Sequence, residues 1–232
     1  MRGLNIHIEH DASTIAAMSN LDAPACDGVI VKLGRADQVL ASTMRSNPLG
    51  SGWLLDVDSP SSRMVTWSGT LAEHLFEAHP MTWGKPGHEA LVAFCDAAAP
   101  QLKSHGRTLC FQPHARHVLS DPQSCLRFIR DREGQPFEIA LAPCSLLEPA
   151  MLSRLEDHLS RMFESLGGQC AMVMLTDAAL SEDGESVVPV SLGQGILQRD
   201  VVRSLFEQHI PAETPIVLQP GNLGEQLAWL DG

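Results

Sequence analysis

Short apolar runs recur along the chain, and most are followed by a segment with helical periodicity. The second half shows this pattern most clearly. Its continuous apolar runs predict strands over residues 108–111, 137–141, 171–175 and 216–218. Amphipathic spacing and capping residues predict helices over residues 122–131, 148–166, 200–209 and 223–230. Apolar strands separated by helices are typical of a parallel sheet that is covered on its outer face.

The first half of the chain is less regular. Apolar or alternating runs predict strands over residues 4–9, 28–33, 53–57 and 63–67. Helices are predicted over residues 11–20, 36–44 and 70–104, the last one interrupted near residues 80–86. The strands around Asp56 and Val65 are separated by only a few residues, which is too short for a crossover helix. The sequence therefore predicts either a lost helix or a hairpin at that point.

Eight predicted strands with helices between most of them favour a (β/α)₈ TIM barrel, shortened and irregular in its first half. The chain has 232 residues, enough for one sizeable core and few for two ordinary domains, so we expect a single domain over residues 1–232. A doubly wound open sheet is the alternative. No G-x-G-x-x-G pattern follows any predicted strand, which counts against that alternative.

Composition narrows the class of protein. The net charge is −12, so a nucleic acid would be repelled overall. No apolar run is long enough for a membrane span, and the stretch "MRGLNIHIEHDAS" lacks the apolar core of a secretory signal. The six cysteines form no C-x-x-C pair, which predicts reduced and buried thiols. We expect a cytoplasmic protein that binds neither nucleic acid nor membrane, and exposed apolar residues on a shortened barrel would be consistent with a homodimer.

Four segments resemble, in order, motifs of the sugar isomerase/epimerase family with the xylose-isomerase-like barrel. The segment "TLCFQPH" takes the place of that family's "lEpH" strand, and "FEIALAPCSLL" that of its "gl.lD.gH" strand. The segment "CAMVMLTDAALSEDG" resembles its "vHlkD" strand and loop, and "VPVSLGQGILQRD…PIVLQPGN" resembles its "GxGxld…lE" ending. The resemblance covers roughly residues 88–222 and implies a TIM barrel with its site at the C-terminal mouth.

The resemblance also implies a divalent metal, held by a Glu, an Asp, a His and a second Glu. The matching positions in this chain are Gln112, a position near Ala142, Met174 and Gln219. Hard cations prefer anionic oxygens, and zinc prefers imidazole, thiolate or carboxylate, so these residues predict no metal and no other cofactor. Metal-dependent isomerisation is then not expected. A metal site rebuilt from carboxylates on other strands is the alternative, with Glu9, Asp56, Asp58 and Asp177 as its ligands.

Four residues are candidates for proton transfer at the mouth: His114, Asp177, Glu9 and Asp56. His114 matches the histidine of "EpH", and Asp177 matches the aspartate of "HlkD". In the alternative interpretation, His114 is a loop or helix-capping residue and Asp177 accepts hydrogen bonds from the loop that follows it. Glu9 and Asp56, on the first and third predicted strands, could form a carboxylate pair across the mouth.

Six further residues are candidates for ligand binding: Gln112, Gln219, Asn222, Cys144, Gly193 and Gly195. Side-chain amides donate and accept hydrogen bonds, as neighbouring hydroxyls of a sugar or polyol require. Cys144 could act as a nucleophile beside His114, or could be a small buried residue. The "LGQGI" segment with Gly193 and Gly195 could cradle a phosphate at a helix start, or could be an ordinary turn.

Two functional hypotheses follow. The first is a divergent isomerase/epimerase-like barrel without the usual metal ligands, which binds a small sugar- or polyol-like ligand, or a partner, at its C-terminal mouth. The second is an active isomerase, epimerase or lyase, metal-independent or with a re-sited metal, that acts on a sugar-like carbonyl substrate by acid–base chemistry. The sequence does not choose between a binding protein and an enzyme.

Overall fold

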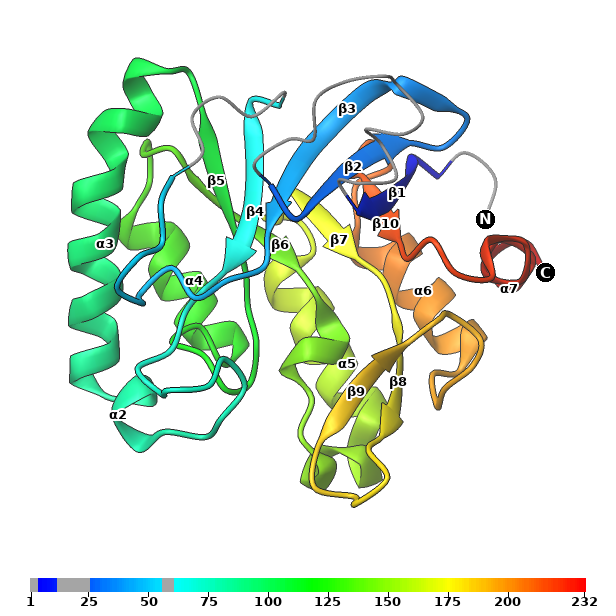
Figure 1. Ribbon diagram of the computed structural model, residues 1–232. Helices are drawn as coiled ribbons and strands as arrows, with labels where there is room; N and C mark the ends of the chain where they lie inside the picture. The colour runs from blue at the N-terminus through cyan, green and yellow to red at the C-terminus, as the bar shows by residue number, and fades with distance from the viewer. Residues whose placement is uncertain (1–3, 12–25, 56–60) are drawn as a thin grey trace.

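The computed structural model describes residues 4–11, 26–55 and 61–232. Eight strands close into a barrel in the order β1-β10-β7-β6-β5-β4-β3-β2 (Figure 1). Their bounds are Ile6–Asp11 (β1), Gly28–Lys32 (β2), Arg35–Met44 (β3), Arg63–Trp67 (β4), Thr108–Gln112 (β5), Phe137–Leu141 (β6), Met172–Met174 (β7) and Ile216–Leu218 (β10). All neighbours pair in parallel except β2, which is antiparallel to both β1 and β3. The predicted TIM barrel with an irregular first half is confirmed.

Helices cover the outside of this barrel (Figure 1). Their bounds are Pro80–Trp83 (α2), Lys85–Ser104 (α3), Pro122–Asp131 (α4), Leu155–Leu166 (α5), Arg199–His209 (α6) and Leu223–Asp231 (α7). Two 3₁₀ segments, Pro143–Leu146 and Pro149–Arg154, precede α5, and a separate hairpin joins Asp177–Leu180 (β8) to Val187–Val190 (β9). Among the residues with described positions, no helix is both long and apolar enough to cross a membrane.

The helix predicted over residues 36–44 is wrong, because these residues belong to β3. A tight turn at Leu33-Gly34, where Gly34 has a φ of +72°, joins β2 to β3 as a hairpin. Strand β3 pairs with β2 on one edge and with β4 on the other. This pairing outweighs the helical preference of residues such as Leu40 and Ala41. The connection between β2 and β3 therefore lacks a helix, and the described part of the connection between β3 and β4, residues 45–55 and 61–62, contains none either.

Three other boundaries differ from prediction. In the strand predicted over residues 53–57, residues 53–55 form no strand, and positions 56 and 57 lie outside the described residues. Most of the helix predicted over residues 11–20 also lies outside the described residues. The helix expected from Thr70 begins only at Pro80, a favourable first residue for a helix. The helix expected from Glu148 begins with a 3₁₀ segment and becomes α-helical at Leu155.

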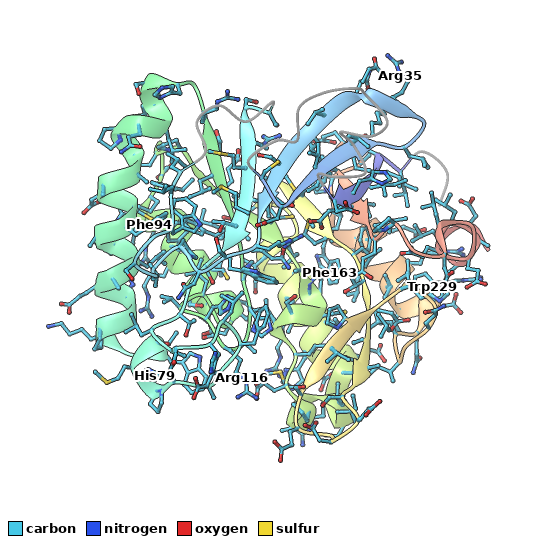
Figure 2. The ribbon with its side chains drawn as sticks, viewed as in Figure 1. Arg35, His79, Phe94, Arg116, Phe163 and Trp229 are labelled. Atoms are coloured by element: carbon cyan, nitrogen blue, oxygen red, sulfur yellow. The ribbon has the colours of Figure 1, made fainter. Side chains whose placement is uncertain are left out.

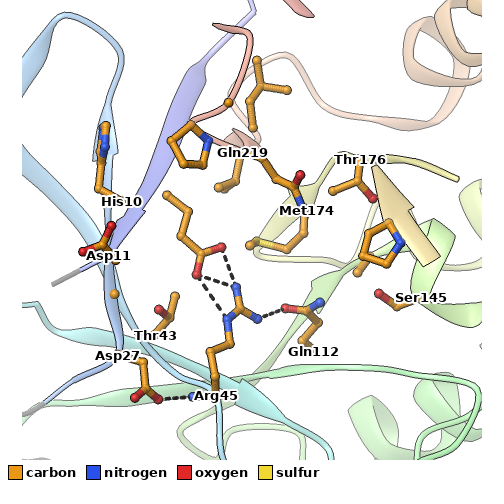
Figure 3. A pocket seen from close by; sticks show the side chains of 18 of the residues that line it. His10, Asp11, Asp27, Thr43, Arg45, Gln112, Ser145, Met174, Thr176 and Gln219 are labelled. Atoms are coloured by element: carbon orange, nitrogen blue, oxygen red, sulfur yellow. Dashed lines mark hydrogen bonds and ion pairs between the residues drawn. The ribbon is translucent and has the colours of Figure 1, made fainter. Parts of the chain in front are cut away.

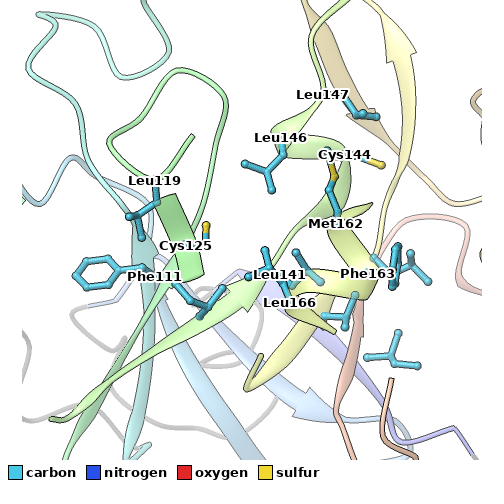
Figure 4. Close-up of a cluster of buried hydrophobic side chains, with 14 of the residues drawn as sticks. Phe111, Leu119, Cys125, Leu141, Cys144, Leu146, Leu147, Met162, Phe163 and Leu166 are labelled. Atoms are coloured by element: carbon cyan, nitrogen blue, oxygen red, sulfur yellow. The ribbon is translucent and has the colours of Figure 1, made fainter. Parts of the chain in front are cut away.

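Alternation along the strands builds two apolar layers. Inside the barrel are β-branched, small and sulfur-containing side chains, including Ile30, Val65, Cys110, Ala140, Met172 and Val217. Their neighbours in sequence face outward against the helices, where Phe111, Leu141, Met162 and Phe163 pack together with Cys125 (Figure 4). Because the outer layer holds the helices against the strands, it fixes the positions of the strand ends that form the mouth.

Candidate functional site

The C-terminal mouth of the barrel contains a cavity of about 510 Å³. Seven parallel strands end at this mouth, and the reversed strand β2 begins there. On every barrel strand, residues that face into the barrel alternate with residues that face outward. One residue of each inward-facing series lies in the cavity wall, either within the strand or directly next to it. These residues are Glu9, Gly28, Arg45, Trp67, Gln112, Ala142, Met174 and Gln219. The cavity is therefore a direct product of strand alternation.

Arg45 directly follows β3, and its guanidinium group lies at the centre of this cavity (Figure 3). Its Nη2 donates to both carboxylate oxygens of Glu9 at 2.5 Å, and its Nε donates to Glu9 Oε1 at 3.2 Å. Its Nη1 donates to Oε1 of Gln112 at 2.5 Å. Charge-assisted bonds in a fork geometry are strong and directional, so the guanidinium is fixed between two strands.

The Arg45–Glu9 ion pair is shielded but still open to the cavity. The two side chains retain 28% and 21% of their accessible surface. The guanidinium carbon lies 5.4 Å from the centre of the Trp67 ring, within cation–π distance. The backbone N–H of Arg45 donates to Asp27 at 2.5 Å, which ties the arginine to the start of β2. The arginine is thus positioned through both its side chain and its backbone.

Thr43 adds an unpartnered polar atom to the same wall. The residue is fully buried, and its hydroxyl oxygen has no hydrogen-bond partner within the described protein. Thr43 lines the cavity, close to Gly28, and its hydroxyl would be 2.6 Å from a Cβ atom at that position. A buried hydroxyl without a partner is costly, so a hydrogen bond to a molecule in the cavity would relieve this cost.

Several residues predicted from sequence meet in this cavity. Glu9, Gln112 and Gln219 all line it. Asn222 is not among its lining residues; it precedes α7 in a left-handed conformation with φ +51°. Asp56 lies outside the described residues, so the predicted Glu9–Asp56 pair cannot be placed. Glu9 instead forms its pair with Arg45.

Asp177 is not part of the cavity wall. It is fully buried and accepts hydrogen bonds from three backbone N–H groups, those of Ala178, Gly193 and Leu197, at 2.8–3.0 Å. This geometry matches the alternative interpretation, in which the carboxylate organises the loop that follows it.

The same contacts match the alternative interpretation of the "LGQGI" segment as an ordinary turn. Gly193 donates its N–H to Asp177, and a Cβ atom on Gly195 would lie 2.4 Å from the Asp177 carboxylate. The chain's own carboxylate therefore occupies the place that an anion would take. Gly193, with φ +88°, also packs closely on Trp229.

Cys144 is a buried thiol and does not line the mouth cavity. Its sulfur donates to the carbonyl of Thr176 at 3.0 Å, and burial raises its pKa to about 12. A thiol that stays protonated at neutral pH is a poor nucleophile. The neighbouring Ser145 lines the cavity in its place.

His114 lines a second cavity beside the mouth, not the mouth cavity itself. Its Nδ1 accepts the backbone N–H of Arg116 at 3.0 Å, which places the ring proton on Nε2. Burial, with the nearby charges of His117 and Arg116, lowers the pKa of His114 to about 3. So weak a base does not suit the proton-transfer role predicted from sequence.

The neighbouring His117 predicts a pH dependence of stability. Its ring is fully buried, its Nε2 donates to the carbonyl of Leu75 at 2.9 Å, and burial lowers its pKa to about 4. Between this value and the unfolded value of 6.5, only the unfolded chain binds the proton, so stability falls as pH falls through this range. We expect a loss of about 2–3 kcal/mol between about pH 7 and pH 4 from this residue.

Urea unfolding of the wild type and of His117→Gln at several pH values measures this effect. The variant is less stable at neutral pH but has a shallower dependence on pH. Equal slopes for the two proteins would contradict the assignment.

Sequence reasoning missed Arg45 and Trp67 as site residues. A helix predicted over residues 36–44 hides the inward-facing series that ends at Arg45. Ala41 and Thr43 belong to this series, but Ser42 and Met44 between and after them are buried as well, so no alternation of buried and exposed positions marks it. Trp67 ends β4 and lines both cavities.

Comparison with solved structures identifies the fold. The chain is similar to the probable 3-DHS dehydratase AsbF of Bacillus anthracis, with a TM-score of 0.56 and 10% identity over 85% of this chain and 78% of that chain. It is also similar to an L-ribulose 3-epimerase, with a TM-score of 0.55 and 13% identity over 94% and 72% of the two chains. A xylose isomerase-like TIM barrel protein from Mycobacterium smegmatis, solved with magnesium, gives a TM-score of 0.54 and 12% identity over 84% and 74%.

The fold is that of the xylose isomerase-like TIM barrels. At these identities the likeness establishes the fold and leaves activity to the site. No protein-family model matches the sequence, and no curated protein gives a significant match.

The divalent metal implied by this fold family does not fit the residues at the mouth. The four positions matched from sequence, Gln112, Ala142, Met174 and Gln219, do line one cavity, but they supply no carboxylate, imidazole or thiolate. The cationic side chain of Arg45 is hydrogen-bonded to one of these residues, Gln112, and would repel a metal ion bound among them. In the described part of the chain, no group of three or more His, Cys, Asp or Glu side chains is placed to bind a metal ion.

Proposed function

We propose that this xylose isomerase-like barrel binds a small sugar- or polyol-like ligand in its mouth cavity, with the Arg45–Glu9 pair at the centre in place of a divalent metal. The observation that carries the proposal is the position of the Arg45 guanidinium, held by Glu9 and Gln112 among the positions that match the family's metal ligands. The pair presents fixed donors and acceptors to the cavity, as a row of hydroxyls requires.

The remaining polar groups of the wall support a hydroxylated ligand. Hydroxyl and amide side chains surround the pair: Thr43, Ser145, Thr176, Ser191 and Gln219. Each of these groups can donate and accept a hydrogen bond, so they match hydroxyls without requiring a charge. The L-ribulose 3-epimerase among the similar structures lends support to a carbohydrate-like ligand.

The charge of the wall favours an uncharged ligand over a phosphorylated one. Three carboxylates line the cavity, those of Glu9, Asp11 and Asp27, against the single guanidinium of Arg45. A phosphate group would enter a negative potential in a partly shielded site, which opposes binding. The site is therefore suited to a neutral polyol or free sugar.

Binding of neutral polyols and sugars, followed by calorimetry in the presence of EDTA, tests this proposal. The panel contains ribitol, xylitol, D-fructose and L-ribulose, with ribose 5-phosphate as the anionic comparison. At least one neutral compound binds the wild type, and Arg45→Ala weakens its binding by about tenfold or more, equivalent to about 1.4 kcal/mol.

Arg35→Ala is the matched control, because Arg35 forms an exposed pair with Asp37 far from the cavity. Circular dichroism confirms that both variants fold. The proposal fails if no neutral compound binds, or if the two arginine variants behave alike.

A metal-independent isomerase or epimerase is the second candidate. It is favoured by one observation: the cavity places a carboxylate, Glu9, beside a guanidinium, Arg45, so that a proton acceptor adjoins a group able to polarise a carbonyl. Product formation from D-fructose or L-ribulose in EDTA, followed by chromatography, tests it. Turnover that Glu9→Gln abolishes supports catalysis, whereas binding without turnover leaves the first proposal alone.

A further inference from the structure

A second cavity, of about 610 Å³, adjoins the mouth cavity. Its walls come from residues 76–78, residues 114–116, the start of the second 3₁₀ segment and the β8–β9 hairpin. Trp67, Ser145 and Pro189 line both cavities, so the two lie side by side and share these residues as wall. In Figure 2, Arg116 of this wall lies between α2 and the β8–β9 hairpin. A ligand long enough to pass Trp67, Ser145 and Pro189 would reach from the mouth into the second cavity.

The second cavity has an aromatic wall. The ring of Phe76 lies 5.2 Å from that of Trp67 and 4.8 Å from that of His114. Phe76 is 49% exposed, although it belongs to a well-packed group of rings. Val187, Val188 and Leu147 supply apolar surface to the same cavity. An exposed phenylalanine in a concave, aromatic setting is suited to stacking with a planar group.

The charged groups around this cavity are mostly acidic. Arg116 forms an ion pair with Glu148 at 2.9 Å, so these two charges balance. Glu77, Asp183 and Glu185 also line the cavity, and no lysine or further arginine is among its lining residues. Asp183 accepts hydrogen bonds from the Ser181 hydroxyl at 2.6 Å and the Glu185 N–H at 3.0 Å, which favours its charged form. A cavity wall with this excess of carboxylates attracts cations and repels anions.

We infer that the second cavity is a subsite for a planar aromatic group of the ligand, one that carries a positive charge or none. The inference rests on the proposed function, because it makes the bound molecule a polyol or sugar joined to a planar ring. The hydroxylated part occupies the mouth around Arg45, and the ring stacks against Phe76 beyond Trp67. A negatively charged ring is excluded by the acidic wall.

Three probes of the same shape and different charge test the subsite: benzamidine, benzamide and benzoate. Their binding to the full chain is measured by ligand-observed NMR titration, alone and in the presence of xylitol. Benzamidine binds about tenfold more tightly than benzoate, with benzamide between them. Phe76→Ala weakens benzamidine binding by about fivefold or more, because the stacking surface is lost.

Met81→Ala is the control, since Met81 is equally exposed and lies outside both cavities. The double variant Glu77→Gln/Glu185→Gln reduces the preference for benzamidine over benzamide, because it removes two negative charges and keeps the Phe76 ring. Benzoate binding as tightly as benzamidine, or equal behaviour of Phe76→Ala and Met81→Ala, would overturn the inference.

The polyol panel distinguishes failure of the subsite from failure of the proposed function. If a polyol binds in the mouth but the binding of benzamidine is unchanged in Phe76→Ala, only the subsite is refuted. If the binding of benzamidine depends on Phe76 but no polyol binds, the proposed function is refuted. The idea that one ligand spans both cavities is then refuted as well. Simultaneous binding of xylitol and benzamidine supports both.

Discussion

Replacement of Asp177 by alanine is expected to lower the free energy of unfolding by about 3–5 kcal/mol, one of the two largest effects that we predict. The buried carboxylate accepts hydrogen bonds from three backbone N–H groups. Its removal leaves these donors without partners in the interior, where each costs about 1–3 kcal/mol before relaxation. Chemical denaturation followed by circular dichroism measures the loss.

Asp183→Ala is the matched control. Asp183 is an exposed carboxylate on the connection between β8 and β9, and it also accepts hydrogen bonds from its own turn. We expect its removal to cost much less stability than the removal of Asp177, because solvent replaces the lost hydrogen bonds of an exposed carboxylate. Asp177→Asn, which keeps one acceptor oxygen, falls between the two. A stable Asp177→Ala protein with altered binding alone would instead support the role predicted from sequence.

The second large effect is the creation of a metal site in the mouth. Four changes introduce the metal-ligand pattern that the sequence resemblance implies: Gln112→Glu, Ala142→Asp, Met174→His and Gln219→Glu. Combined with Arg45→Ala, they provide three carboxylates and an imidazole in one cavity, and they free Glu9 from its ion pair. We expect this five-site variant to bind Mn²⁺ or Co²⁺ stoichiometrically, at about micromolar affinity or better.

Metal content after loading and desalting, measured by mass spectrometry, is the readout. The wild type and Arg45→Ala elute without metal, because neither supplies anionic donors at the four positions. The four-site variant that retains Arg45 binds at least about tenfold more weakly than the five-site variant, since the guanidinium repels the ion. A five-site variant without metal, or a wild type with stoichiometric metal, would contradict our account of the mouth.

The barrel strands of the second half were predictable because each is a short, continuous apolar run bounded by turns or caps, whereas the β8–β9 hairpin was not predicted. Residues 108–111 and 137–141 need only their own sequence to be identified as buried strands. The cap at Asp121 was equally local, and its side chain accepts the N–H groups of Gln123 and Ser124 as expected.

The first half was harder because tertiary pairing decided it. Residues 36–44 contain Leu, Ala and Met, which favour a helix, yet pairing on both edges makes them a strand. This error had a consequence for the site. Without β3, nothing in the sequence placed Arg45 opposite Glu9, and the central ion pair could not be predicted.

Some candidate residues have positions that follow from the local sequence, and others have positions that depend on contacts with distant parts of the chain. Gln112 and Gln219 directly extend apolar strands, so alternation places them in the mouth. Asp177 and Cys144 lie farther from the ends of β7 and β6, and a loop and a carbonyl group take up their polar atoms. Sequence shows that a polar residue follows a strand; only packing shows which partner it finds.

A crystal structure of the wild type with the tightest-binding neutral polyol of the panel, grown in EDTA, tests the central claim most directly. Our account predicts a ligand in the mouth cavity, with hydroxyl groups hydrogen-bonded to the Arg45–Glu9 pair and to neighbouring groups such as Gln219 or Thr43. The Arg45 guanidinium remains between Glu9 and Gln112. A ligand bound elsewhere, or a metal ion bridging ligand and protein with Arg45 displaced, would contradict it.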